Sequence, residues 1–147
     1  MIKKISFSLI LILHLCYGIY SQVSQEWIKR VSGTRREGDF AKKILKDLQG
    51  KIIVMGIVDD STSYNNMVLY KYNADGSVIW NRKYIGPGNS DDNAEDICLD
   101  RNNNYLIAGN NRDSYQTTLI KYSQEGNLLW SKMFPYSIGY AVVSDNS

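Results

Sequence analysis

The chain has 147 residues, of which 44% are hydrophobic and 22% are charged, with 17 lysines and arginines against 15 acidic residues. This near balance lacks the clustered basic excess that is typical of proteins that bind nucleic acid or an anionic membrane surface. The single histidine, His14, lies in an N-terminal segment that we expect to be removed, which excludes histidine-based catalysis and nearly all catalytic zinc chemistry for the remainder.

Residues 1–21 have the pattern of a secretory signal peptide. Lys3 and Lys4 supply the charged start, and residues 5–17 form an apolar stretch that is too short and too interrupted for a transmembrane helix. We therefore expect residues 22–147 to be secreted or displayed at the cell surface, with no integral membrane segment after cleavage. Removal of the two lysines leaves equal numbers of basic and acidic residues.

Two cleavage sites fit the end of this segment, one after Gly18 and one after Ser21. An alternative is a lipoprotein signal in which Cys16 is acylated, but the bulky Leu15 just before it disfavours that processing. After ordinary cleavage Cys98 is the only cysteine that remains, so no internal disulfide can form.

Trp27, Trp80 and Trp130 mark a sequence unit that occurs twice in full and begins a third time. The units cover about residues 27–79, 80–129 and 130–147. At an offset of 53 residues, the first two units share identities at Trp27/Trp80, Gly33/Gly86, Asp39/Asp92, Ala41/Ala94, Ile44/Ile97, Asp47/Asp100, Gly56/Gly109, Asp60/Asp113 and Ser61/Ser114.

Beyond Ser114 the offset between the units falls to 50, and residues 69–80 then match residues 119–130. The missing residues fall between Ser114 and Leu119, opposite the polar run 62–66 of the first unit. A length change confined to a polar connection is typical of a true repeat, because loops tolerate insertions better than strands do.

Each unit contains four short strand-like runs separated by turn residues. Gly76 and Gly126 stand where a type I turn followed by a left-handed bulge residue requires glycine. Phe40, Ile44 and Leu48 have helical spacing, but the aligned segment of the second unit indicates a strand. In the second unit we expect successive antiparallel strands at Ala94 to Asp100, Tyr105 to Gly109, Thr117 to Tyr122 and Asn127 to Phe134.

Four antiparallel strands in a repeat of about 40 to 50 residues are typical of a β-propeller blade. Lys-Tyr-x-x-x-Gly occurs before the second and third tryptophans, at residues 71–76 and 121–126, and Asp-x-Ala occurs at residues 39–41 and 92–94. In these motifs the chain resembles the bacterial β-propeller repeats of the SBBP type, which are found in secreted and surface proteins. It is more weakly similar to the tryptophan-docking repeats of quinoprotein dehydrogenases.

This resemblance implies an all-β fold of β-propeller-type four-stranded antiparallel blades, about two and a half of them, in an incomplete ring, with the tryptophans packed between neighbouring blades. We expect strands at Gln25 to Val31 and at Ala141 to Ser144, near the two ends of the repeat region. Since closed propellers need roughly four to eight blades, we expect a chain truncated relative to its family. The alternative is a ring assembled from several copies, because unpaired sheet edges favour association.

No catalytic motif with suitable spacing is present, and we assign no catalytic, cofactor-binding or metal-binding residue. The densest polar cluster, residues 89–96, could bind calcium through oxygen ligands, but it lacks the spacing of an EF-hand. Asp92 aligns with Asp39, which favours a turn in which the carboxylate accepts hydrogen bonds from backbone amides. We expect Cys98 to be a buried, unreactive thiol in an apolar run.

Two functional hypotheses follow. The first is a secreted or surface module with a non-catalytic binding or scaffold role, which contacts protein or glycan through the loops at residues 58–66, 85–93 and 110–116. The alternative is a fragment of a quinoprotein-like oxidoreductase. The quinoprotein resemblance implies pyrroloquinoline quinone and calcium at the centre of a complete ring, and the lack of histidine outside residues 1–21 weighs against it.

Overall fold

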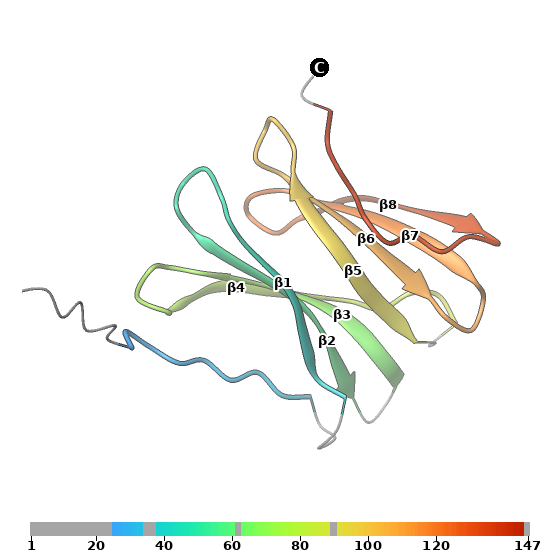
Figure 1. Ribbon diagram of the computed structural model, residues 1–147, viewed down its shortest axis with the longest axis horizontal. Coiled ribbons are helices and arrows are strands. Elements are labelled where there is room, and N and C mark those ends of the chain that lie inside the picture. Colours follow the sequence, from blue (N-terminus) through green and yellow to red (C-terminus); the bar gives the residue numbers. More distant parts are fainter. Residues whose placement is uncertain (1–24, 34–37, 61–62, 89–90, 146–147) are drawn as a thin grey trace, which may run out of the picture.

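The computed structural model describes residues 25–33, 38–60, 63–88 and 91–145. The signal peptide expected at residues 1–21 lies outside these ranges. Within them the protein is all-β, with two four-stranded antiparallel sheets and no helix (Figure 1). None of the described ranges holds a helix long and apolar enough to cross a membrane.

Both sheets are meanders in which each strand pairs with the next one along the chain. The first sheet has the order β1-β2-β3-β4, with β1 at Phe40–Lys46, β2 at Ile52–Asp60, β3 at Ser63–Tyr72 and β4 at Val78–Tyr84. The second has the order β5-β6-β7-β8, with β5 at Asp92–Leu99, β6 at Tyr105–Asn111, β7 at Gln116–Tyr122 and β8 at Leu128–Pro135. The strands and hairpins expected in the second unit are confirmed, with ends that differ by at most two residues.

The same irregularities occur at matching places in the two sheets. The first strand pair has a register shift after Ala41 in one sheet and after Ala94 in the other. The last strand pair has a shift next to Lys71 in one sheet and next to Lys121 in the other. Gly76 and Gly126 have φ angles of 79° and 80°, as their expected turn requires.

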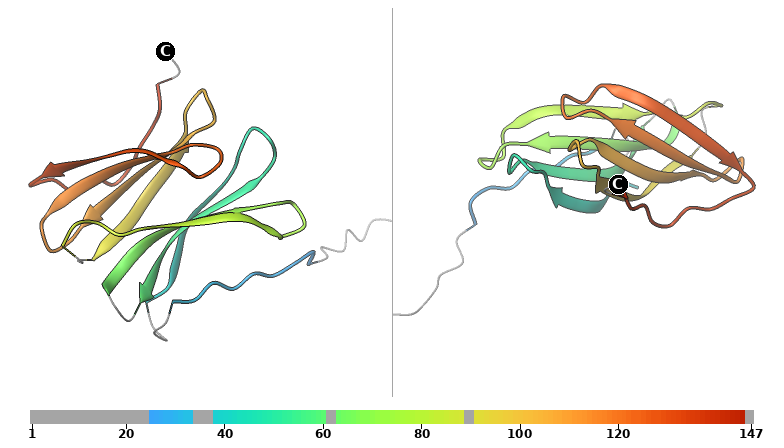
Figure 2. Two further views of the ribbon diagram at one scale, coloured as in Figure 1. Left: turned by 180° about the vertical axis from the view of Figure 1, so that it is seen from behind. Right: turned by 90° about the horizontal axis from the view of Figure 1, so that it is seen from above.

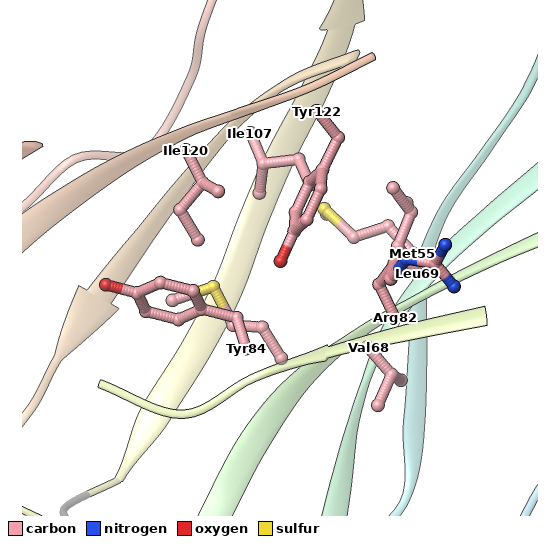
Figure 3. Close-up of a pocket in the computed structure, with 9 residues that line it drawn as sticks. Met55, Val68, Leu69, Arg82, Tyr84, Ile107, Ile120 and Tyr122 are labelled. Atoms are coloured by element: carbon pink, nitrogen blue, oxygen red, sulfur yellow. The ribbon is translucent and has the colours of Figure 1, made fainter. Parts of the chain in front are cut away.

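The core lies between the two sheets, because alternate side chains of each strand point to opposite faces. From the first sheet, Ile53, Met55 and Leu69 face the second sheet, where the buried cluster continues with Ile97, Tyr105, Ile107, Ile120 and Tyr122. Figure 2 shows the second sheet stacked on one face of the first. Figure 3 shows part of this interface, where both sheets enclose a void of about 10 Å3, at the lower limit for one water molecule.

Two expected strands are not strands in the structure. Residues 25–33 and 136–145 run along the sheets without strand pairing, although we expected strands at Gln25 to Val31 and at Ala141 to Ser144. The reason is the absence of a neighbouring strand among the described residues, since an extended segment becomes a strand only by sharing a hydrogen-bond ladder. The described residues form no closed ring.

Candidate functional site

The three loops expected to carry binding meet at one end of the two sheets, and Asp91 joins them. Its side chain Oδ1 accepts a hydrogen bond of 2.8 Å from the backbone nitrogen of Asn65, in the loop 58–66. Its backbone carbonyl accepts a bond of 3.0 Å from the backbone nitrogen of Arg112, in the loop 110–116. Residue 91 itself belongs to the loop 85–93. The sheets therefore hold these loops in a common position, which we call the loop end.

Two aspartates fix the backbone where the chain enters each sheet. The Asp39 carboxylate accepts hydrogen bonds from the backbone nitrogens of Gly33 and Asp59, at 2.8 and 2.9 Å. Asp92, which is 1% exposed, likewise accepts a bond from the backbone nitrogen of Gly86. The expected role of Asp92 in accepting backbone hydrogen bonds is thus confirmed. Burial raises the pKa of Asp92, an effect that this hydrogen bond only partly offsets.

Gly33 and Gly86 are required by this arrangement. A Cβ atom on Gly33 would lie 1.8 Å from the backbone oxygen of Asp59, and one on Gly86 would lie 2.6 Å from the Asp92 carboxylate. Only glycine, which has no Cβ, allows the backbone of Asp59 and the carboxylate of Asp92 to approach this closely. The shared glycine–aspartate pairs of the two sequence units therefore fix the backbone at the entry to each sheet.

A groove of about 300 Å3 lies at the loop end beside the turn between β6 and β7. Tyr115 and Tyr140 on its rim are 67% and 75% exposed, and Tyr115 has a positive φ of 50°. A non-glycine residue in this conformation is uncommon and often marks a constrained loop. The groove is lined by Glu95, Asn110, Asn111, Arg112, Tyr115, Ser137, Ile138 and Tyr140.

Asn110 holds the C-terminal segment against this groove. Its side-chain amide donates to the backbone oxygen of Gly139, and its side-chain oxygen accepts from the backbone nitrogen of Gly139, both at 2.8 Å. A methyl group on Gly139 would meet Thr117 at 2.7 Å, so the segment packs closely on β7. The groove therefore has one rigid wall from the sheet and one from an irregular segment that a side-chain amide fixes in place.

The composition of the groove suits binding more than catalysis. Exposed tyrosine rings offer flat apolar faces with a polar hydroxyl, and Arg112 adds a cationic hydrogen-bond donor. Glu95 is the one carboxylate among the described lining residues, whereas glycoside hydrolysis normally uses a pair. No group of three or more His, Cys, Asp or Glu residues in the described part of the chain is arranged to hold a metal ion.

The polar cluster at residues 89–96 is divided among several structural roles. Residues 89 and 90 lie outside the described ranges. The side chains of Asp91 and Asp92 accept hydrogen bonds from backbone amides. Asp96 accepts a hydrogen bond of 2.9 Å from the backbone nitrogen of Val142 and forms an ion pair with Lys43. The described carboxylates of this cluster therefore have protein partners at separate places in the structure.

Cys98 is half-buried, where we expected it to be buried. It lies on β5, and the face of the second sheet that points away from the first is covered only in part by the C-terminal segment. Burial nevertheless raises the pKa of the Cys98 thiol, and the charge of nearby Asp96 raises it further. A thiol with a raised pKa is a poor nucleophile at neutral pH.

Trp80 packs against the second sheet from β4 of the first. Its ring lies over Gly126, where a Cβ atom would approach within 3.0 Å, and it meets the ring of Tyr105 edge-on at 5.7 Å. Arg82 reinforces the contact by donating to the backbone oxygen of Gly126 at 2.6 Å. The expectation that Trp80 packs between successive four-stranded units is in agreement with this geometry.

A buried ion pair between the sheets was missed by the sequence reasoning. Lys71 lies 2.9 Å from Asp47, and the hydroxyl of Tyr105 donates to the same carboxylate at 3.0 Å. All three residues are at most 7% exposed. Burial opposes ionisation of Asp47, but the hydrogen bonds from Lys71, Lys51 and Tyr105 outweigh it and lower the pKa of Asp47. The identity of Asp47 and Asp100 in the alignment of the two units was the sequence feature that could have indicated a shared structural role for this aspartate.

No protein-family model matches the chain, and no curated protein matches it. The fold and the loop end thus define the class of protein, an all-β protein of two stacked antiparallel meanders with a tyrosine-lined groove at one end.

Proposed function

We propose that the protein is a secreted or cell-surface β-propeller repeat module with a non-catalytic binding role. In this proposal the two sheets are successive blades, formed by about residues 27–79 and 80–129, and residues 130–147 begin a third. The matching register shifts, the matching glycine turns and the two aspartate-held entries support a repeated unit. The sequence motifs that resemble SBBP-type repeats support the family.

The observation that carries the binding role is the groove at the loop end. Tyr115 and Tyr140 expose most of their side chains there, although the loop below them is fixed by Asp91 and Asn110. Exposed aromatic side chains on loops that a rigid scaffold positions are typical of recognition surfaces for proteins and glycans. Burying both rings against a partner would remove apolar surface from water at little cost in side-chain entropy.

The test is a screen of glycans and of extracellular peptides against the wild-type chain, followed by Tyr115→Ala and Tyr140→Ala. Both substitutions should weaken the binding of any hit about tenfold or more and leave the free energy of unfolding almost unchanged. Tyr136→Ala is the matched control, because Tyr136 is 94% exposed but does not line the groove. If Tyr136→Ala weakens binding as much as the two groove variants, the groove is not the binding site.

The alternative is a fragment of a quinoprotein-like oxidoreductase. The contact of Trp80 with the turn at Gly126 is what favours it, because the weaker resemblance concerns tryptophan-docking repeats. Incubation with pyrroloquinoline quinone and calcium separates the two proposals. Quinone absorbance that remains with the protein after gel filtration would support the alternative, and its complete loss would count against it.

A further inference from the structure

The contact between Trp80 and the second sheet occurs a second time in the molecule, on the first sheet. The indole nitrogen of Trp27 donates to the backbone oxygen of Ala74 at 2.8 Å, just as that of Trp80 donates to the backbone oxygen of Gln124 at 3.1 Å. A Cβ atom on Gly76 would lie 2.6 Å from the Trp27 ring. Residues 25–33, which we call the N-terminal arm, therefore occupy on the first sheet the position that β4 occupies on the second.

The arm covers an apolar face. The first sheet points Val54, Val68 and Tyr70 away from the second sheet, and together with Trp27 and Tyr72 they line an open groove of about 570 Å3. In the alignment Val54 corresponds to Ile107 and Tyr72 to Tyr122, which are buried in the core between the sheets. This outer face of the first sheet thus has the chemistry of a face that a neighbouring sheet covers.

The second sheet has an outer face that corresponds to the inner face of the first. Lys121 and Asp100 form an ion pair at 2.7 Å, as the aligned Lys71 and Asp47 do between the sheets. The Lys132 Nζ atom lies 5.8 Å from the centre of the Trp130 ring, just as the Arg82 Cζ atom lies 5.4 Å from the centre of the Trp80 ring. No hairpin in the described residues packs on Trp130. Instead it borders a hollow of about 580 Å3 lined by Asp100, Arg101, Asn102, Leu106, Lys121, Trp130, Val143, Ser144 and Asp145.

These two faces are complementary, because the protein already joins a pair of the same kind. Inside one molecule, the face with Asp47, Lys71 and Trp80 docks on the face with Tyr105 and Tyr122. The outer face of the second sheet resembles the face with Asp47, Lys71 and Trp80. The outer face of the first sheet resembles the face with Tyr105 and Tyr122. Faces that differ from one another and pair in this way make a head-to-tail contact between two molecules.

We propose that the outer face of the second sheet binds the outer face of the first sheet of a second copy of this chain, with Trp130 on the turn 74–76 of that copy. The N-terminal arm competes with this contact, since Trp27 occupies the site that Trp130 requires. The C-terminal segment 139–145 covers part of the other face, where β1 of the second copy would lie. Neither covering segment has a strand partner. The arm is held by the hydrogen bonds of Trp27 to Ala74 and of Gly33 to Asp39. The C-terminal segment is held by the bonds of Gly139 to Asn110 and of Val142 to Asp96, so the release of either segment breaks only a few hydrogen bonds.

Association therefore depends on release of the arm. A site that is available in only a fraction of the molecules binds its partner more weakly by that fraction. Substitution Trp27→Ala removes the side chain that holds the arm and should strengthen self-association about tenfold or more. Substitution Trp130→Ala removes the docking side chain and should abolish the gain when the two are combined. The contact goes beyond the proposed binding role, because its docking faces include neither Tyr115 nor Tyr140, although release of residues 139–145 would move Tyr140 away from the groove.

Sedimentation velocity of the full chain over a range of concentrations measures these effects, and circular dichroism verifies that each variant is folded. The inference is overturned if folded Trp27→Ala sediments like the wild type. It is equally overturned if the double variant Trp27→Ala/Trp130→Ala associates as strongly as Trp27→Ala alone. In that case the exposed apolar face would associate without the docking of Trp130.

A cross-linking experiment identifies the contact directly. Arg82 donates to the backbone oxygens of Glu125 and Gly126, and the aligned residues in the proposed contact are Lys132 of one copy and Asp75 of the other. In a Cys98→Ser background with Trp27→Ala, a Lys132→Cys copy mixed with an Asp75→Cys copy should give a mixed dimer with a short bis-maleimide. An Asp113→Cys copy replaces Asp75→Cys as the matched control. Equal yields from both mixtures would contradict the proposed contact.

Discussion

The indole nitrogen of Trp80 and the side-chain nitrogen of Lys71 both donate to the backbone carbonyl of Gln124, at 3.1 and 3.2 Å. One carbonyl in the turn between β7 and β8 therefore receives two donors from the first sheet. The turn leaves this carbonyl outside any strand ladder, and the first sheet satisfies it. The two sheets are thus linked by directional polar contacts as well as by their apolar core.

Substitution Trp80→Ala should lower the free energy of unfolding by about 3 kcal/mol, because it removes both a hydrogen bond and a large aromatic contact with Tyr105 and Gly126. Urea unfolding followed by circular dichroism measures the loss. Trp130→Ala is the matched control, since it removes the same side chain where no described hairpin packs on it. Equal losses in the two variants would show that the contact with the second sheet contributes little.

Substitution Asp47→Asn should cost about 3–5 kcal/mol, because it leaves the Lys71 charge buried with no carboxylate beside it. Adding Lys71→Met removes that charge and should recover a large part of the loss. The comparison of the two variants by urea unfolding separates the cost of a buried charge from the cost of an altered turn. If the double variant is no more stable than Asp47→Asn, the unpaired Lys71 charge is not the source of the loss.

The stability of the second sheet should depend on acid pH through Asp100. Burial opposes its ionisation, but hydrogen bonds from Lys121 and Asn104 outweigh that effect and lower the pKa of Asp100 to about 2, from an ordinary 3.8. A lowered pKa stabilises the fold above about pH 4, and the contribution disappears as the pH falls through about 2. Asp100→Asn should therefore cost about 2 kcal/mol at pH 7 and much less near pH 2. A cost that does not change between these pH values would contradict this prediction.

Cys98 should react with a thiol reagent more slowly in the native protein than in the unfolded chain. It is half-buried and its pKa is raised by burial, so the thiolate is scarce at neutral pH. Labelling rates in buffer and in denaturant provide the measurement. Because the raised pKa limits the thiolate, the native rate should rise with pH up to a higher midpoint than the unfolded rate does. Identical midpoints would show that the environment of Cys98 does not perturb it.

Sequence patterns were sufficient where one short segment determines its own structure. The turns at Gly76 and Gly126 follow from glycine's access to positive φ, and the strands of the second unit follow from their apolar runs between such turns. In the first unit the alignment correctly predicted a strand for Phe40–Lys46, against a local helical spacing. Phe40 and Ile44 remain 61% and 65% exposed, so this spacing does not mark a buried helix face.

Contacts between distant segments could not be predicted in the same way. Asp91, Asn65 and Arg112 are far apart in the sequence, and nothing in their local patterns indicates that they join three loops. The groove with Tyr115 and Tyr140 likewise needs residues 137–140, which precede the segment Ala141 to Ser144 that we expected to be a strand. The half-burial of Cys98 depends on how much of its face that segment covers.

The sequence by itself determined the strands of the two sheets, their order in two antiparallel meanders and the turns between them, because neighbouring strands joined by short connections pair with each other. It wrongly indicated strands at the two ends of the repeat region. Only the tertiary structure decided which face of each sheet is covered and by what. That outcome depends on whether a second sheet or an unpaired segment such as the N-terminal arm reaches the face. The alternating pattern of a strand indicates that one face is apolar, but it does not indicate which segment buries that face.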